Sequence, residues 1–153
     1  MNIDPSKLEM LQEAARQAVD AAYVPYSRFP VGAAVLTSSG AVFSACNVEN
    51  ASYGLSMCAE RSAIFKMISE REQDVVAVAV FTPTSTPSAP CGACRQVISE
   101  FGPDAVVMSS CESDQVLLST IGQLLPDQFG PQNFKKGGEI NETGSKKGGL
   151  GHT

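Results

Sequence analysis

The chain has 153 residues, 43% of them hydrophobic and 18% charged, which is sufficient for one globular domain with a core. It has no stretch of about 18 consecutive apolar residues and no basic start followed by an apolar run, so we expect no membrane span, no export signal and a cytoplasmic location. Residues 1–134 carry 7 basic and 14 acidic side chains, and this net charge of −7 argues against a nucleic-acid partner, which needs clustered Lys and Arg.

The first predicted element is a helix that follows Asp4. Asp is a favourable N-cap, and Pro5 fits the first helical position, where its missing N–H has no cost. Apolar residues then recur at steps of three and four: Leu8, Leu11, Ala15, Ala18, Val19 and Ala22. We expect one amphipathic helix that continues towards the break at Pro25.

A β-hairpin and a second helix come next. The β-rich segments 31–37 and 41–48 are joined by Ser38-Ser39-Gly40, a short link in which Gly can adopt a positive φ. After a loop at residues 50–54, residues 58–69 have a helical composition.

The segment 75–81 is a nearly unbroken apolar run, as expected for a central strand buried on both faces. We expect a second cysteine-bearing helix through about Phe101, a strand at 106–108, another at 116–120, and a short helical turn that ends at Pro126. The order strand, helix, strand favours a parallel, right-handed crossover.

The last segment, residues 135–153, is rich in Gly, Lys, Ser and Thr and nearly free of apolar residues. Such a composition cannot offset the entropy of ordering, so we expect a disordered tail, whether natural or a cloning remnant. The predicted domain therefore spans residues 1–134.

Three of the five cysteines form a pattern typical of a metal site. An odd number of cysteines without an export signal favours metal binding or catalysis over disulfides. Cys91 and Cys94 lie on one face of a predicted helix, and Cys58 begins the other cysteine-bearing helix. Zinc with three protein ligands keeps a position for water, as catalytic sites require, and the acid Glu60 lies two residues after Cys58.

Charge compensation fits such a site. Three thiolates and Zn²⁺ sum to −1, which would weaken the pull of the metal on water. Two helix N-termini carry partial positive charge, and Arg61 and Arg95 each follow a candidate ligand in the sequence.

Other interpretations of the cysteines remain open. The pair Cys91 and Cys94 could be a redox motif, or the site could be structural, with Cys46 or Cys111 as a fourth ligand. Otherwise Cys46 and Cys111 are most simply small buried hydrophobic residues.

Two motifs resemble those of a known enzyme family. Residues 58–61 read Cys-Ala-Glu-Arg and residues 90–96 read Pro-Cys-Gly-Ala-Cys-Arg-Gln, close to the signature of zinc deaminases. The chain resembles the small cytidine deaminases with three cysteine ligands. Segments 26–34, 47–54 and 124–126 match the same family, and the resemblance covers roughly residues 6 to 130.

The resemblance implies a fold and an activity. The fold would be α/β, a three-layer α/β/α sandwich around a mixed sheet of about five strands. Residues 1–134 would be the catalytic domain of a hydrolase that converts cytidine and deoxycytidine to uridine and deoxyuridine in pyrimidine salvage.

The resemblance also implies roles for individual residues. Zinc would be held by Cys58, Cys91 and Cys94, and Glu60 would carry protons from water to N3 and the departing amine. Phe29, Asn47, Glu49 and Ala59 would bind the nucleoside, with Asn47 and Glu49 on the ribose 3′-hydroxyl. Arg61 and Gln96 would contact the thiolates. The family is homotetrameric, so Tyr53 and Phe129 would lie at a subunit boundary.

Three rival functions would use some of the same residues. A deaminase of another cytosine-bearing molecule, such as blasticidin S, would use the same zinc chemistry, but the segment 47–50 argues against it. A zinc-stapled scaffold would have no need of Glu60. An RNA- or DNA-editing deaminase fits the acidic body least well.

Overall fold

The computed structural model describes residues 3–134, and the predicted tail at 135–153, with the histidine His152, lies outside this range. The helices are α1 (Pro5–Ala18), α2 (Ala59–Ser69), α3 (Gly92–Phe101) and α4 (Ile121–Leu124), with 3₁₀ turns at Val19–Ala21, Tyr53–Leu55 and Pro131–Phe134. The strands are β1 (Gly32–Thr37), β2 (Val42–Cys46), β3 (Val75–Phe81), β4 (Val106–Ser110) and β5 (Val116–Thr120). No helix within 3–134 is both long and apolar enough to cross a membrane.

The helix α1 begins as predicted but ends earlier. The Asp4 carboxylate accepts a hydrogen bond from the N–H of Ser6 at 3.0 Å, which makes Asp4 the N-cap. The expected continuation towards Pro25 is wrong: regular helix stops at Ala18, a 3₁₀ turn follows, and Tyr23 forms a bridge with Val48. The end of α1 depends on pairing with a segment distant in the sequence, which a local apolar pattern cannot predict.

The five strands form one mixed sheet in the order β2-β1-β3-β4-β5, so the predicted central position of β3 is confirmed. The pair β1 and β2 is the expected antiparallel hairpin, with Gly40 at φ 90° in its turn. Strands β3 and β4 are parallel, as the strand–helix–strand order predicted.

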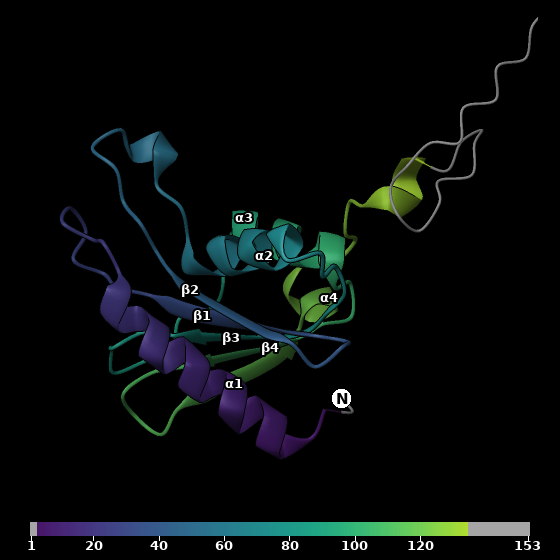
Figure 1. The fold of residues 1–153 in the computed structure, drawn as a ribbon, viewed down its shortest axis with the longest axis horizontal. Coiled ribbons are helices and arrows are strands. Elements are labelled where there is room, and N and C mark those ends of the chain that lie inside the picture. Colours follow the sequence, from purple (N-terminus) through teal and green to yellow (C-terminus); the bar gives the residue numbers. More distant parts are fainter. Residues whose placement is uncertain (1–2, 135–153) are drawn as a thin grey trace, which may run out of the picture.

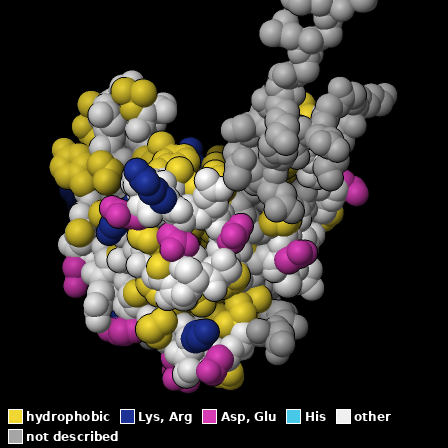
Figure 2. All heavy atoms as spheres, turned by 45° about the vertical axis from the view of Figure 1, so that its right-hand side comes forward, with side chains coloured by type: hydrophobic (Ala, Val, Ile, Leu, Met, Phe, Trp, Pro, Cys, Tyr) yellow, Lys and Arg dark blue, Asp and Glu magenta, His cyan; other side chains and the backbone are white. Residues whose placement is uncertain are grey.

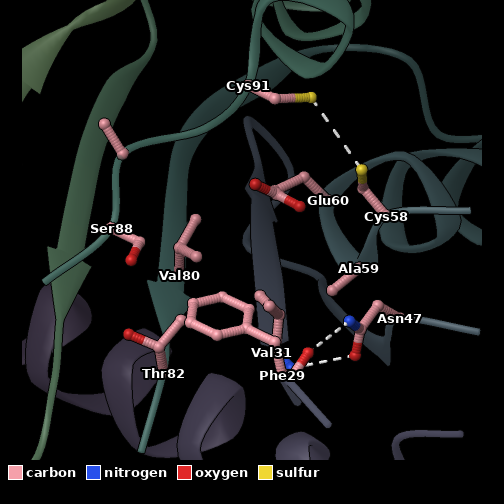
Figure 3. A pocket seen from close by; sticks show the side chains of 11 residues that line it. Phe29, Val31, Asn47, Cys58, Ala59, Glu60, Val80, Thr82, Ser88 and Cys91 are labelled. Atoms are coloured by element: carbon pink, nitrogen blue, oxygen red, sulfur yellow. Dashed lines mark hydrogen bonds between the residues drawn. The ribbon is translucent and has the colours of Figure 1, made fainter. Parts of the chain in front are cut away.

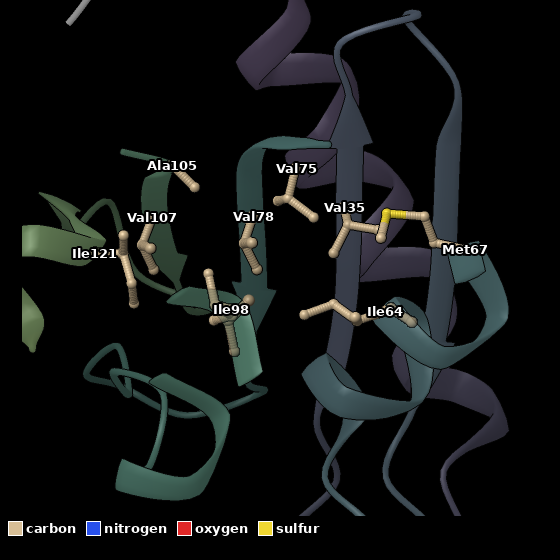
Figure 4. Close-up of a cluster of buried hydrophobic side chains, with 11 residues drawn as sticks. Val35, Ile64, Met67, Val75, Val78, Ile98, Ala105, Val107 and Ile121 are labelled. Atoms are coloured by element: carbon tan, nitrogen blue, oxygen red, sulfur yellow. The ribbon is translucent and has the colours of Figure 1, made fainter. Parts of the chain in front are cut away.

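Helices cover both faces of the sheet, which confirms the three-layer α/β/α arrangement (Figure 1). On one face, Leu11 and Ala15 of α1 pack over the sheet, and α1 lies so close to β1 that a Cβ at Gly32 would lie 2.0 Å from the carbonyl oxygen of Ala15. On the other face, Ile64 and Met67 of α2 pack with Ile98 of α3 (Figure 4). Each fully buried aliphatic side chain of this kind contributes about 1.5–3 kcal/mol.

This topology brings two distant loops together at one edge of the sheet. Because α3 follows β3, its N-terminus lies at the carboxyl end of that strand. The helix α2 packs beside α3, and the two start where Cys58 and Cys91 meet (Figures 1 and 3). Carboxyl edges of α/β sheets are common ligand sites.

Candidate functional site

Three cysteines form the centre of the site. The Sγ atoms of Cys58 and Cys91 are 3.9 Å apart, and those of Cys91 and Cys94 are 3.5 Å apart. All three lie within 4.8 Å of one another. Two sulfurs on one tetrahedral zinc at about 2.3 Å each would be about 3.8 Å apart, so the spacing fits one zinc ion.

Two helix N-termini point at this cluster. Cys58 is the N-cap of α2 and Cys91 is the N-cap of α3, and neither side chain caps its own helix. Both sulfurs are therefore free to bind a metal, while the unpaired first N–H groups of two helices place partial positive charge beside them. This is the arrangement that the sequence predicted.

A cavity of about 230 Å³ opens beside the thiols (Figure 3). Glu60 lines it and is 5% exposed. Burial, and next the negative charge of the Cys58 thiolate, raise the pKa of Glu60. A carboxyl group with a raised pKa holds its proton more tightly than a solvated one, which suits it to act as a general acid as well as a general base.

The cavity contains most of the predicted nucleoside-binding residues. Phe29, Asn47 and Ala59 line it together with Glu60 and two of the thiols, Cys58 and Cys91. Glu49 does not line this cavity; it lies in a neighbouring hollow with Tyr26 and Tyr53.

Asn47 and Glu49 fix the segment that carries Phe29. The Asn47 Oδ1 accepts from the N–H of Val31 at 2.9 Å, and its Nδ2 donates to the carbonyl of Phe29 at 2.9 Å. The Glu49 carboxylate accepts from the N–H groups of Tyr26 and Ser27 at 3.0 and 3.1 Å. Burial alone would raise the pKa of Glu49, but these hydrogen bonds outweigh it and lower that pKa.

Comparison with known proteins identifies the family. Residues 5–110 match the model of the cytidine and deoxycytidylate deaminase zinc-binding region. A cytidine deaminase of Halalkalibacterium halodurans is 50% identical over 79% of this chain and 92% of the relative. The crystal structure of cytidine deaminase from Burkholderia pseudomallei aligns with a TM-score of 0.76 and 48% identity, over 79% of this chain and 98% of that one.

The chain belongs to the cytidine deaminase family. A blasticidin-S deaminase of Bacillus cereus is a more distant relative, 32% identical over 84% of this chain and 95% of the relative.

The family model describes a zinc-binding region, and the thiol set of this chain fits zinc. Hydrogen bonds from Cys94 and Arg61 lower the pKa of Cys58 to about 5 against the opposing effect of burial. The shared hydrogen bond and burial raise the pKa of Cys94, so the metal-free site is expected to hold a Cys58 thiolate beside a Cys94 thiol. Binding zinc would then release the remaining protons.

The two arginines beside the ligands act differently. The Nη2 of Arg61 donates to Cys58 Sγ at 3.4 Å, as the resemblance implied, and its buried Nε has no hydrogen-bond partner within residues 3–134. The Arg95 guanidinium instead donates to the backbone carbonyls of Pro90 and Leu124. Of the two arginines that the sequence offered for charge compensation, only Arg61 donates a hydrogen bond to a thiol.

Several other predicted residues lie outside the cavity. The Gln96 amide donates to the carbonyl of Phe129 at 2.9 Å, where the resemblance implied a thiolate partner. Tyr53 and Phe129 are 74% and 59% exposed, each in edge contact with another aromatic ring. Within residues 3–134, the thiol cluster does not include Cys46 or Cys111, the two candidate fourth ligands.

Five residues that line the cavity were not among the predicted site residues, namely Val31, Val80, Thr82, Ser88 and Ala89. Val80 and Thr82 lie at the carboxyl end of the central strand β3, an edge at which α/β proteins commonly bind ligands. That signal was available once β3 was placed. Ser88 lies in the Pro-rich loop before Cys91 and gave no such signal.

Proposed function

We propose that this chain hydrolyses the 4-amino group of cytidine and deoxycytidine, giving uridine or deoxyuridine and ammonia, as a step of pyrimidine salvage. One observation carries the assignment: Glu60 is buried in the same cavity as the thiols without belonging to their cluster. A structural zinc site has no use for such a carboxylate, whereas deamination needs a group that moves protons.

In the proposed reaction, water adds to C4 of the pyrimidine and ammonia leaves. Zinc held by Cys58, Cys91 and Cys94 supplies the Lewis acidity that makes water a sufficient nucleophile at neutral pH. Glu60 takes one proton from the attacking water and delivers it to N3. It then takes the second proton from the hydroxyl now on C4 and delivers it to the amine, which leaves as ammonia when the C4–N bond breaks. Its raised pKa suits it to both directions of transfer.

The remaining lining residues would orient the base. Because Glu60 must reach N3 and the amine at C4, that edge of the ring faces the start of α2. The adjacent 2-oxo group then lies near Ala59, whose N–H in the first turn of α2 has no acceptor within the helix. Phe29 offers its ring to the pyrimidine from the opposite wall (Figure 3).

Asn47 and Glu49 retain capacity for a ribose hydroxyl. Asn47 uses one of its two amide hydrogens on Phe29, and the Glu49 carboxylate has lone pairs beyond those that hold Tyr26 and Ser27. We propose that both bond the 3′-hydroxyl, with Glu49 reaching in from the neighbouring hollow.

Free cytosine is therefore expected to be a poor substrate. Losing the hydroxyl leaves polar groups without partners, and each such loss costs about 1–3 kcal/mol, so kcat/KM for cytosine should fall about 10–100-fold or more below that for cytidine. Ultraviolet absorbance follows both conversions side by side. Equal kcat/KM values would contradict the ribose assignment, and no turnover of cytidine would contradict the proposed function itself.

Blasticidin S is the less favoured substrate. The chain is 50% identical to the cytidine deaminase and 32% identical to the blasticidin-S deaminase. Asn47 also lines the cavity, as a ribose-binding group should. Adding blasticidin S to the same assay compares the two directly.

We propose a homotetramer in which Tyr53 and Phe129 meet neighbouring subunits. The segment around Tyr53 projects from the body, and its exposed apolar side chains include Tyr53 and Leu55 (Figures 1 and 2). Sedimentation of the purified protein tests the assembly.

The surface charge fits a small substrate. On the face drawn in Figure 2, acidic side chains are scattered among few basic ones, which suits a small nucleoside better than a polyanion.

Residues 1–134 are proposed to be the complete catalytic domain. The three thiols and Glu60 all lie within residues 58–94, so a chain ending at Phe134 should bind one zinc and keep full activity towards cytidine. Metal analysis and kcat of that shortened chain, beside the full chain, are the measurements. Loss of zinc on shortening would place a ligand in residues 135–153.

A further inference from the structure

Cys91 is the least enclosed of the three zinc ligands. Cys94 is fully buried in the first turn of α3, and Cys58 is half-buried and bonded by Arg61. Cys91 is exposed and lies outside the regular helix, as its N-cap. Packing of its own side chain therefore does little to hold its sulfur in place, and the backbone before it must be fixed by other means.

Arg95 fixes that backbone. Its Nε donates to the carbonyl of Pro90, the residue directly before Cys91, at 2.8 Å. Its Nη1 donates to the carbonyl of Leu124 at 2.9 Å, across 29 residues of sequence. One planar guanidinium thus joins the metal-binding loop to the end of α4.

The helix α4 is itself well anchored at both ends. At its start, the Thr120 Oγ1 accepts from the N–H of Gln123 at 3.3 Å, and the Gln123 Oε1 accepts from the N–H of Thr120 at 2.9 Å. Ile121 is fully buried among the core residues under α3. At the other end, Leu124 presents a carbonyl at the helix C-terminus, where a cation is favourable.

We propose that Arg95 is a positioning residue: its forked contact with Pro90 and Leu124 uses α4 as a fixed support that holds Cys91 in place for zinc. This role differs from charge compensation, since the donors of Arg95 are directed at backbone carbonyls and Arg61 already contacts a thiol. A planar fork can serve two carbonyls at once, whereas the single ammonium of Lys on a different stem cannot reproduce both directions.

The test measures how fast zinc leaves the full-length protein under excess chelator. Removing a residue that supports a metal ligand typically lowers metal affinity about 10–100-fold. Both Arg95→Met and Arg95→Lys should therefore release zinc about 10–100-fold faster than the wild type. Arg16→Met is the matched control, because Arg16 lies over the Phe81 ring on the other face of the sheet. This variant should release zinc at the wild-type rate. Wild-type release from Arg95→Lys would show that charge alone suffices and would overturn the proposal.

A second variant, at an exposed residue, tests directly whether α4 supports the metal-binding loop. Gln123→Ala removes the capping box of α4. As a single variant it should speed zinc release several-fold. Combined with Arg95→Met it should add nothing, because the link between α4 and the loop is already absent there. Wild-type release from Gln123→Ala, or additive effects in the double variant, would overturn the coupling through Arg95. Thermal unfolding of the metal-free variants separates loss of the fold from loss of the link.

Discussion

Glu60→Gln is expected to lower kcat for cytidine at least about 10²-fold, while zinc content and fold stay as in the wild type. Gln keeps the size and polarity of the side chain but cannot take up or release a proton. Every step proposed for Glu60 is a proton transfer, and general acid–base catalysis is worth about 10²–10⁴-fold. The measurement is kcat, with zinc content determined on the same preparation.

Stability provides an independent check on this variant. Because burial raises the pKa of Glu60, the folded protein binds this proton more tightly than the unfolded chain, and stability is lost as the pH rises through the folded-state pKa. Gln carries no charge, so metal-free Glu60→Gln should unfold at a temperature no lower than wild type at neutral pH.

Glu70→Gln is the control, since Glu70 is an exposed residue at the end of the same helix, α2. It should leave kcat unchanged. If Glu60→Gln turned over cytidine at the wild-type rate, the proton-transfer group would have to be another residue.

Cys94→Ser should abolish both stoichiometric zinc and turnover. Cys94 is fully buried, and its Sγ lies 3.5 Å from that of Cys91, so serine fits the space but offers a hydroxyl that does not ionise as a thiol does. Removal of a direct ligand should weaken zinc binding by more than the about 10–100-fold typical of outer contacts. Metal analysis after dialysis and cytidine turnover report the two losses.

Cys111→Ser makes the same chemical change outside the cluster. Cys111 is also buried, and its thiol lies 3.2 Å from the Ser113 hydroxyl, a polar setting that accepts serine. This variant should keep zinc and activity. Loss of zinc from Cys111→Ser, or its retention by Cys94→Ser, would contradict the ligand set.

Local patterns were sufficient wherever neighbouring residues decide the structure. The apolar run at 75–81 identified the central strand because a strand covered on both faces must be apolar throughout. The three-residue spacing of Cys91 and Cys94 placed both at the start of α3, where Cys91 is the N-cap and Cys94 lies in the first turn. Asp4 and Pro5 marked the start of α1 for a similarly local reason, since an N-cap binds N–H groups two or three residues ahead.

The partners that individual residues find in the folded chain were beyond the reach of such patterns. The end of α1 depends on the pairing of Tyr23 with Val48. The partners of Arg95 and Gln96 are the backbone carbonyls of Pro90, Leu124 and Phe129, and a sequence motif records which donors exist but not which acceptors lie near them. The assembly state and the roles of Tyr53 and Phe129 stay predictions.

The sequence by itself determined the order of the elements, the three thiols and the acid beside them, because secondary structure and ligand chemistry follow from residue type and short spacing. Only the tertiary structure decided that Cys58 lies 3.9 Å from Cys91, that Glu60 is buried beside them, and that Arg61, not Arg95, contacts a thiol. Those facts depend on how α2 and α3 pack at the carboxyl edge of β3, and packing follows from contacts between residues distant in sequence.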